Sequence, residues 1–584
     1  MKNKIALKLM PDSSFLLGGV SVNPAYDAVT ALDNGIPYLT ATAVKGALRM
    51  DFESFARGID EVKLCELDTD FHGCGVCLSC RLFGGGNEEG KLRFYAAFPV
   101  TGKDIFKKGN RDGILEKGKR EGVSISRTLG KAKDKSYYST LTFPNLKGSV
   151  DIFFDTHIDI QKEPDEEERL YLNAFFAFLE RTGLFMGSRK SVGLGNFKVT
   201  CHIPDGFEQH GQVDTSKSEL KLFRVTLETL EPLVVGNLKN KYIVNTLPYL
   251  PTSTLGGSIG FGFIKIGVKE DTVSGLFYHK HSFSPFNFYF QKKLPEHSMF
   301  KNPFPKPTSM RARKGEKEIE KDILLSDFIL KKAIGSGKFK EVKSLFKSLY
   351  RSNLRPVSIC EKPGTTYHTK VAIGRILQKT KKEMLYSMEL IPKGSEFQGI
   401  VIGEEWTGDV LKDMELFIGG KRTRGFGRSK VLTVEEIGTD QLINPEVSID
   451  KELRKMAKEF PVTIPDDRRY FTLDVLADLE VPPGKTLEFI LKEELFAGMD
   501  VNIEQSYPDV IRRGGYSFKE NEKKEKPLVE KIGAGSTFLV SVPVDKTETF
   551  TKKVARMVEE SINHKWDSTP LFLLNNPKHK ETWR

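Results

Sequence analysis

Alternating apolar and polar positions mark several short strands along the chain. Residues 1–14 place Ile5, Leu7 and Leu9 on one face of an extended segment. The same two-residue period returns in three further segments, at residues 91–98, 149–154 and 223–230. A period of two is typical of a strand with one buried face. Because the first segment lacks the unbroken apolar core of a signal peptide, we predict that it is the first strand of a sheet.

Helical spacing of apolar residues occurs in two places. Val44, Leu48 and Phe52 recur at this spacing. Thr40 and Thr42, at the start of this run, are both candidate helix caps. Residues 170–184 predict a second, Phe-rich helix behind an acidic first turn. Strands and helices in this mixed order indicate α+β domains with antiparallel sheets.

The chain repeats itself with a long, imperfect period. Three landmarks occur in the same order in each half. They are PYLTATAVKGALR at 37–49 and PYLPTSTLGGSIG at 248–260, a strand pair at 122–139 and 369–387, and GLFMGSRKSVGLGNFKV at 183–199 and LFIGGKRTRGFGRSKV at 416–431. We therefore predict two domains, at residues 1–215 and 221–584, joined by a polar link at 215–220.

Composition adds a preference for an anionic partner. The 584 residues are 39% hydrophobic, enough to build cores, and carry a net charge of +11. A basic surface favours nucleic acid or another polyanion. Residues 301–350 hold thirteen basic and six acidic residues. We expect an insertion at about 296–350 that is either a solvated segment or an arm facing RNA.

The two glycine-rich loops are candidate phosphate sites. Glycine lets the backbone approach a phosphate closely, and interspersed Lys and Arg supply charge. The predicted helix start adds an anion site of the helix-terminus type. The candidate RNA-binding residues are Lys45, Arg49, Arg127, Arg189, Lys190, Ser191, Gly193 and Gly195 in the first domain and Arg375, Lys421, Arg422, Arg424, Gly425, Gly427 and Arg428 in the second.

Four of the six cysteines lie close together in the first domain. Cys65, Cys74, Cys77 and Cys80 form the pattern Cys-x8-Cys-x2-Cys-x2-Cys, with His72 nearby as a substitute ligand. Thiolates at two-residue spacing can turn back on one tetrahedral zinc ion, and a closed set of four leaves no position for a catalytic water. We predict a structural zinc site in an insertion at about residues 65–80. An iron–sulfur cluster and a cluster without metal are the alternatives.

The runs PYLTATAVKGALR and CLSCRLFGGGNEEGKLRFYAAFP, followed by the glycine-rich loop, resemble the RAMP superfamily of CRISPR effector subunits. The resemblance covers most of the chain. It implies tandem ferredoxin-like (RRM-like) domains with antiparallel sheets and a β-hairpin thumb, which we expect at residues 101–120. The first domain resembles a type III backbone subunit, a family that lines up along the guide RNA (crRNA).

The second domain resembles the subunit that caps the 5′ tag of the guide in subtype III-D complexes. The resemblance rests on the run RRGGYSFKENEKKEKPLVEKIGAGSTF from Arg512. Where the first domain has Lys45-Gly46, the second has Gly256-Gly257, so this helix start lacks the basic residue. A fusion of two backbone subunits is therefore the alternative to a backbone subunit fused to a cap.

Catalysis is expected from an aspartate, because the related backbone subunits cut target RNA with an aspartate in the loop after the first strand. Asp33 belongs to Asp33-Asn34-Gly35, a strong turn signature. The resemblance therefore assigns catalysis to Asp27, in NPAYDAV. The implied reaction is attack by the 2′-hydroxyl of the target on the adjacent phosphate, with magnesium as a candidate cofactor.

The expected function is that of a guide-RNA-binding subunit that positions and cuts complementary target RNA in a type III CRISPR complex of a prokaryotic cytoplasm. No segment approaches the roughly 18 apolar residues of a membrane span. The expected partners are crRNA, target RNA and other effector subunits, including the large polymerase-like subunit. Three alternatives stay open: a non-catalytic scaffold of the same complex, an endoribonuclease that processes precursor crRNA, and a general basic RNA-binding protein.

Overall fold

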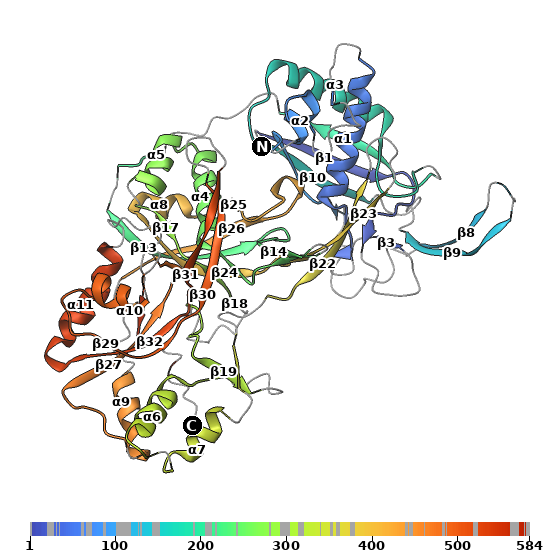
Figure 1. Cartoon of the computed structure of the whole chain (residues 1–584). Helices are drawn as coiled ribbons and strands as arrows, with labels where there is room; N and C mark the ends of the chain where they lie inside the picture. The colour runs from blue at the N-terminus through green and yellow to red at the C-terminus, as the bar shows by residue number, and fades with distance from the viewer. Residues whose placement is uncertain are drawn as a thin grey trace.

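The computed structural model places most of the chain in three sheet-based units. It describes residues 3–19, 28–30, 32–33, 36–59, 64–65, 73–85, 89–100, 118–125, 128, 131–142, 152–190, 193–204, 213–216, 219–240, 243–279, 282–291, 304–313, 320–338, 340–350, 354–357, 363–373, 380–438, 442, 448–460, 462–481, 485, 487–517, 524–560, 572–576 and 579. We call the units module 1 (within 3–204), module 2 (within 219–438) and module 3 (within 462–576). Module 1 lies at one end of the molecule, module 2 in the middle and module 3 at the other end (Figure 1).

Module 1 is built around one antiparallel sheet. In chain order its main elements are β1 (Lys4–Pro11), α1 (Ala41–Arg57), β6 (Leu92–Phe94), β10 (Phe153–Ile160), α3 (Glu166–Thr182) and β12 (Asn196–His202). The strand order is β12-β1-β10-β6, with β11 (Leu184–Phe185) beside β12 and β7 (Phe98–Val100) beside β10. This is the βαββαβ, ferredoxin-like topology. Helices α1 and α3 share one core, in which the rings of Phe52 and Phe175 lie 5.2 Å apart.

Module 2 repeats this topology. Its elements are β13 (Leu220–Thr229), β16 (Tyr249–Leu250), α4 (Thr252–Lys265), α5 (Glu270–Ser274), β17 (Ser284–Pro285), β18 (Phe288–Gln291), β24 (Glu396–Glu404), α8 (Glu405–Leu411), β25 (Glu415–Phe417) and β26 (Arg428–Ile437). The strand order β18-β24-β13-β26 matches that of module 1, and β25 lies beside β26 as β11 lies beside β12. The predicted repeat is therefore present in the fold.

Module 3 has the same order once more. It contains β27 (Arg468–Val475), α10 (Leu487–Phe489), which continues as a π-helical turn (Ile490–Leu495), β29 (Asn502–Tyr507), β32 (Thr537–Pro543), α11 (Thr547–Glu560) and β33 (Phe572–Leu574). Its strand order is β29-β32-β27-β33, and it has its own core. The range expected for the second domain thus contains two ferredoxin-like sheets.

A β-hairpin interrupts each module between its second and third main strands. The hairpins are β8 (Gly118–Ile125) with β9 (Ala132–Thr142), β22 (Thr366–Ile373) with β23 (Thr380–Leu390), and β30 (Val510–Ser517) with β31 (Lys524–Ile532). Shorter strands extend them: β2 (Gly18–Gly19) and β3 (Ala28–Thr30), β14 (Gly236–Asn240) and β15 (Ile243–Thr246), and β28 (Leu479–Glu480). The strand pairs predicted at 122–139 and 369–387 are confirmed. The thumb was expected at 101–120, of which only 118–120 lie within the described residues.

Capping explains where the two long helices of module 1 begin. The Thr40 hydroxyl accepts from the N–H of Ala43, 3.3 Å away. Of the two predicted candidates, Thr40 is therefore the cap of α1, and Thr42 lies within the helix. Helix α3 begins at residue 166, earlier than the predicted 170, because Asp165 and Glu168 form a capping box. The three acidic residues that follow Asp165 also suit the positive end of the helix dipole.

The insertion in module 2 is a packed unit. Its described elements are β19 (Met310–Arg313), β20 (Glu320–Asp322), α6 (Leu324–Gly335), α7 (Lys343–Tyr350) and β21 (Leu354–Pro356). Together with α9 (Ile449–Glu459), α6 and α7 form a core that includes Tyr470 of module 3. His579 near the C-terminus is buried between Asp322 and Asp474, at 2.5 Å and 3.0 Å. The insertion is therefore fastened to module 3.

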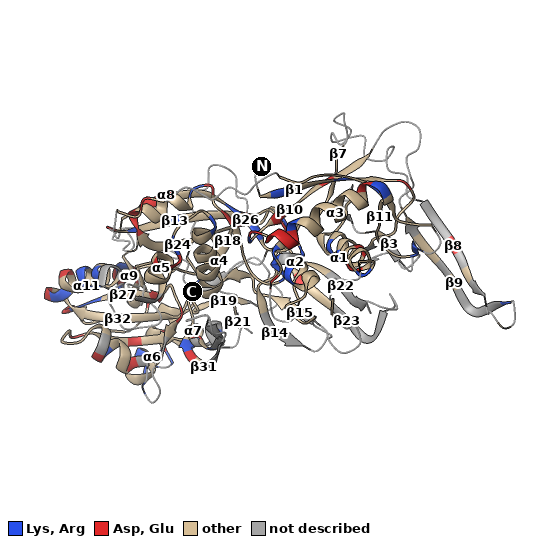
Figure 2. Ribbon diagram, turned by 90° about the horizontal axis from the view of Figure 1, so that it is seen from above, with Lys and Arg blue, Asp and Glu red and all other residues tan. Residues whose placement is uncertain are grey.

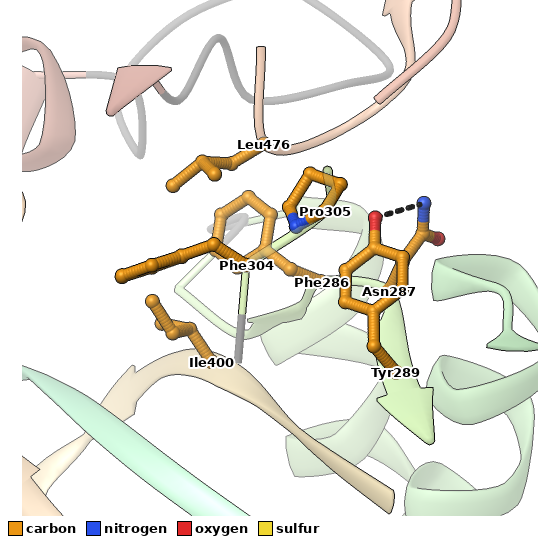
Figure 3. A pocket seen from close by; sticks show the side chains of 7 residues that line it. All are labelled: Phe286, Asn287, Tyr289, Phe304, Pro305, Ile400 and Leu476. Atoms are coloured by element: carbon orange, nitrogen blue, oxygen red, sulfur yellow. Dashed lines mark hydrogen bonds between the residues drawn. The ribbon is translucent and has the colours of Figure 1, made fainter. Parts of the chain in front are cut away.

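Modules 2 and 3 meet at an apolar seam. Phe286 and Ile400 of module 2, Phe304 and Pro305 of the insertion and Leu476 of module 3 line a small shared pocket (Figure 3). Phe286, Ile400 and Leu476 belong to one buried cluster. Among the described residues, no helix combines the length and apolar character needed to cross a membrane.

Candidate nucleic-acid interface and metal centre

The four clustered cysteines of module 1 converge around one point. Their sulfur atoms all lie within 4.8 Å of one another, and Cys65 Sγ lies 3.5 Å from Cys77 Sγ and 3.4 Å from Cys80 Sγ. A tetrahedral zinc ion with Zn–S bonds of about 2.3 Å requires sulfur atoms about 3.8 Å apart. The four thiols could therefore hold a metal ion, and the donor set is compatible with zinc.

Backbone donors favour the thiolate form at Cys74, whereas burial raises the pKa of Cys65 to about 12 and also raises that of Cys77. The N–H of Cys74 donates to Cys65 Sγ and the N–H of Cys77 donates to Cys74 Sγ, both at 3.2 Å. Burial opposes ionisation, but N–H donors from Cys77 and Val76 lower the pKa of the Cys74 thiol to about 7. Metal ligation requires the thiolate. His72, the predicted substitute ligand, lies outside the described residues.

Arg49 connects helix α1 to the cysteine cluster. Its guanidinium donates to Glu53, to the carbonyl of Gly84 and to Cys80 Sγ, at 2.8, 2.6 and 3.5 Å. Ser79 on α2 (Leu78–Phe83) donates to the same carboxylate at 2.7 Å. Because these contacts engage the guanidinium, Arg49 holds the cysteine loop against α1 in this structure.

The two glycine-rich loops have the same backbone geometry. We call Gly187–Gly195 loop 1 and Gly419–Gly427 loop 2. In loop 1 the N–H groups of Met186, Ser188 and Gly195 donate to the carbonyls of Gly195, Leu16 and Ser14 at 2.8, 2.9 and 2.8 Å. In loop 2 those of Ile418, Gly420 and Gly427 donate to Gly427, Val234 and Pro232 at 2.8, 2.9 and 2.9 Å. Arg189 lies two residues after the first glycine of loop 1, and Lys421 lies two residues after the first glycine of loop 2. Both residues have a left-handed backbone conformation, with φ of 62° and 59°.

Glycine is required at the end of each loop by close backbone contact. Gly195 and Gly427 have φ of +78° and +85°, and a Cβ there would lie 1.9 Å from the Met186 carbonyl oxygen and 2.1 Å from that of Ile418. The glycine spacing that predicted the repeat is therefore imposed by the backbone path of the loop.

A matched pair of substitutions separates close contact from backbone strain in loop 1. Gly193 has φ of +82°, and no described atom lies within 4 Å of a Cβ placed there. We expect Gly193→Ala to destabilise module 1 by about 1 kcal/mol and Gly195→Ala by about 3 kcal/mol, because only the second adds a steric clash. Denaturant unfolding followed by fluorescence measures both. Equal losses would contradict the loop geometry.

Loop 1 places Lys190 against helix α1. The Lys190 ammonium lies 3.7 Å from Met50 Sδ. Burial lowers the pKa of Lys190, while the neighbouring Asp51 opposes this shift. Burial also raises the pKa of Asp51 to about 6, against the effect of Lys190. Arg189 is half-buried beside it. Loop 1 thus carries two neighbouring basic residues, of which Lys190 contacts α1.

Loop 2 is seated on module 1. A Cβ at Gly425 would lie 2.1 Å from Cβ of Ala41, the first residue of α1. Arg422 lies 3.0 Å from the Glu89 carboxylate. Arg428 pairs with Glu415 at 2.7 Å. The loop of one module therefore packs on the first helix of the other.

This packing gathers positive charge around Lys45. Burial, and after it the charges of Arg424 and Arg49, lower the pKa of Lys45 to about 7, whereas Glu89 acts in the opposite direction. A half-buried amine with this environment gains charge when an anion binds beside it. The junction of α1 and loop 2 is therefore suited to a phosphate.

Comparison with known families decides the classification. A model of the RAMP superfamily matches residues 18–198 and 226–430, which together make up more than half of the chain. The chain belongs to the RAMP superfamily. No curated protein matches it. The two matched regions correspond to the sheets of modules 1 and 2, and module 3 lies beyond them.

Two solved structures are similar to parts of this RAMP chain. A chain from the cryo-EM structure of the type III-B Cmr-beta bound to cognate target RNA is 13% identical, with 56% of this chain and 89% of that chain covered and a TM-score of 0.30. A chain from the same assembly with AMPPnP, state 1, is 13% identical, with coverages of 54% and 86% and a TM-score of 0.27. These scores are low, so the assignment rests on the family match.

The structure brings together some of the residues predicted for the RAMP site. Gly425 of loop 2 lies against the start of α1, and Lys190 of loop 1 contacts Met50 further along the same helix. The predicted residues outside the described part are Asp27, Arg127, Ser191 and Arg375. Asp33 pairs with Ile36 between β4 (Leu32–Asp33) and β5 (Ile36–Pro37), as the predicted turn requires.

Sequence reasoning missed the residues that join the two RAMP modules. Arg93 is fully buried, and its guanidinium lies 3.6 Å from the centre of the Phe417 ring. Nearby, Asp159 accepts from the Tyr95 hydroxyl at 2.5 Å and lies 3.7 Å from the Lys265 ammonium. An arginine on a strand whose neighbours are apolar is the one signal that could have pointed to Arg93.

Proposed function

We propose that this RAMP chain is a guide-RNA-binding subunit of a type III CRISPR ribonucleoprotein that positions complementary target RNA and cuts it through Asp27. The observation that supports the RNA-binding part is the seating of loop 2 on α1, which places basic groups of two modules side by side. Lys45 comes from module 1, and Arg422 and Arg424 come from module 2. A guide strand running across both modules would meet this charge at successive phosphates.

The proposed binding mode needs no base-reading motif. In RNA-guided complexes base pairing reads the sequence, and the protein recognises backbone shape and charge. Left-handed residues such as Arg189 and Lys421 turn the backbone within each loop. Turns of this kind expose N–H groups that suit phosphate oxygens. The loops and the half-buried amine of Lys45 therefore provide complementary donors for one RNA backbone.

The proposed cut is a transesterification within the target strand. The 2′-oxygen forms a bond to phosphorus as the bond from phosphorus to the 5′-oxygen breaks. The proton of the 2′-hydroxyl passes to the Asp27 carboxylate or to water, and a proton reaches the leaving 5′-oxygen. The products are a 2′,3′-cyclic phosphate and a 5′-hydroxyl. A magnesium ion would stabilise the charge that develops on the phosphate oxygens, and the zinc-type cluster has only a structural role.

RNA affinity should depend on pH through Lys45. In the free protein its pKa is about 7, and a bound phosphate raises it. Binding therefore takes up a proton above pH 7, so affinity is constant below pH 7 and falls by up to about tenfold per pH unit above it. Filter binding of the purified chain to a tagged guide RNA between pH 6 and pH 9 measures this dependence.

Two variants test the assignment of this pH dependence. Lys45→Arg, which stays charged, should flatten the profile while keeping tight binding. Lys412→Met should leave the pH profile unchanged, because Lys412 is an exposed side chain that forms an ion pair with Asp409. A profile that Lys45→Arg does not alter would remove Lys45 from the RNA site.

A further inference from the structure

Arg49 lies where the cysteine cluster meets the helix that carries Lys45. Its side chain is 14% exposed, and each nitrogen of its guanidinium has an acceptor, in Glu53, the carbonyl of Gly84 and Cys80 Sγ. Residues four apart on an α-helix lie on the same face, about one turn apart. Lys45, four residues before Arg49, is therefore the next basic group along this face of α1. The contacts that fix Arg49 at the cluster thus also fix the turn of α1 that presents Lys45.

A second connection runs through the chain that follows the cluster. Helices α1 and α2 lie side by side, on the side of module 1 that faces module 2 (Figure 2). Cys80 belongs to α2, and a Cβ at Gly85 would lie 2.4 Å from its sulfur. Four residues after Gly85, Glu89 pairs with Arg422 of loop 2 at 3.0 Å. The segment from Cys80 to Glu89 therefore joins the cluster to the loop that is proposed to bind RNA.

A bound metal ion strengthens the contact between the cluster and Arg49. Cysteine ligates a metal as the thiolate. Four thiolates around one divalent ion leave an excess of negative charge, and the Arg49 guanidinium faces it, 3.5 Å from Cys80 Sγ. A hydrogen bond with a charged partner is about twice as strong as one between neutral groups. Metal binding therefore holds Arg49, and with it α1, more firmly in place.

The metal has two effects of opposite sign on RNA affinity. Its negatively charged centre repels a phosphate, but Arg49 offsets part of this charge, and salt screens exposed charges more than about 8 Å apart. The metal also fixes Arg49 and Glu89 before RNA binds, so that RNA does not bear the cost of ordering them. We expect the second effect to be the larger, because these two residues adjoin the RNA junction through Lys45 and Arg422.

We propose that a metal ion in the four-cysteine cluster and guide RNA at the junction of α1 and loop 2 bind cooperatively, coupled through Arg49 and the segment that ends at Glu89. Each ligand then raises the affinity for the other by the same factor, since linkage is reciprocal. A factor of about 5–20 is typical of such coupling. Arg49 is a positioning residue, because it engages the cluster and acts on RNA through Lys45. This coupling rests on the proposed RNA-binding function, to which it adds control by a metal ion.

The test measures both affinities of the full chain. Competition with a chromophoric chelator gives the zinc affinity with and without a tagged guide RNA, and filter binding gives the guide affinity with and without zinc. We expect guide RNA to tighten zinc binding about 5–20-fold, and zinc to tighten guide binding by the same factor. Cobalt(II) in place of zinc gives a thiolate-to-metal absorption band, which guide RNA should shift. This band reports on the cluster without removal of the metal.

Three variants locate the coupling. Arg49→Met keeps most of the side-chain length but lacks the guanidinium, and should reduce the coupling to less than about twofold while the chain still binds about one zinc ion. Glu89→Gln leaves the cluster intact and should weaken the coupling by releasing Arg422. Arg57→Met makes the same change at an exposed arginine of α1 and should keep the full factor. A merely structural Arg49 would lower the Tm of Arg49→Met but leave the ratio of its zinc affinities unchanged.

Three results would overturn the proposed coupling: guide RNA that leaves zinc affinity within about twofold, zinc that weakens guide binding, and equal coupling in Arg49→Met and Arg57→Met. If the metal-free chain unfolds, the cobalt band decides, since guide RNA must shift it in the unsubstituted chain and not in Arg49→Met. A metal-loaded chain that binds no tagged guide contradicts the proposed function and the coupling with it. A chain that binds the guide equally well with and without metal contradicts the coupling alone.

Discussion

Replacing Asp27 by asparagine will abolish target-RNA cutting by the assembled complex, with a loss of at least about 100-fold in rate, and will leave guide and target binding unchanged. A general base contributes about 10²–10⁴-fold to a rate. The amide keeps the size and polarity of the carboxylate but neither accepts the 2′-hydroxyl proton nor attracts a cation. Cleavage of a labelled complementary RNA, measured under single-turnover conditions, gives the rate.

The matched control for this experiment is Asp33→Asn. Asp33 lies six residues further along the chain, at the end of β4, where it pairs with Ile36 of β5. The Asp33→Asn variant should cut target RNA at the normal rate. Products ending in a 2′,3′-cyclic phosphate would support the proposed transesterification. If Asp27→Asn retains cutting while binding its target, the catalytic assignment is wrong and the scaffold alternative gains support.

We propose zinc as the ion of the four-cysteine cluster, and on this proposal replacing Cys80 by serine will remove the ion and destabilise module 1. Cys80 is buried, and its sulfur lies within the four-cysteine cluster and accepts from Arg49. Loss of one of four ligands opens the tetrahedral site, and α1 loses a contact that fixes its position. We expect zinc to fall from about one ion per chain to near zero, with a destabilisation of about 3 kcal/mol that lowers the Tm of this module by about 6–12 °C.

The control is Cys201→Ser, because Cys201 is a half-buried cysteine outside the cluster. It should keep the full zinc content and nearly the original Tm. Elemental analysis and scanning calorimetry measure the two quantities. Iron with visible absorbance in place of zinc would favour the iron–sulfur alternative, and zinc retained by Cys80→Ser would contradict the assigned ligand set.

The parts of the fold that sequence predicted are those in which backbone geometry dictates residue type. Gly195 and Gly427 are needed because any side chain there would collide with the carbonyl of Met186 or of Ile418. The repeat therefore leaves a glycine spacing that is visible in the sequence. The cysteine cluster is equally visible, since four ligands must meet at one point. The cap at Thr40 follows from a local hydrogen bond within three residues.

The parts that sequence did not predict depend on contacts between distant segments. Nothing near Arg93 indicates that Phe417 will cover it, and nothing near Gly425 indicates that Ala41 will lie against it. Module 3 lacks the glycine-rich loop signature in its described part, so only its strand order reveals the third ferredoxin-like sheet. The sequence shows the charge of Arg49 and so predicts that this residue binds RNA. It does not show that Arg49 contacts Cys80, because that contact joins segments 31 residues apart.

The measurement that tests the central claim most directly is sequencing of the RNA that co-purifies with the chain when it is expressed with its neighbouring subunits and a CRISPR array. Guide binding predicts short RNAs that share one repeat-derived 5′ tag and differ in the sequence that follows it. Mixed cellular RNA without a common tag, or no RNA, would contradict the claim that this RAMP chain binds a guide.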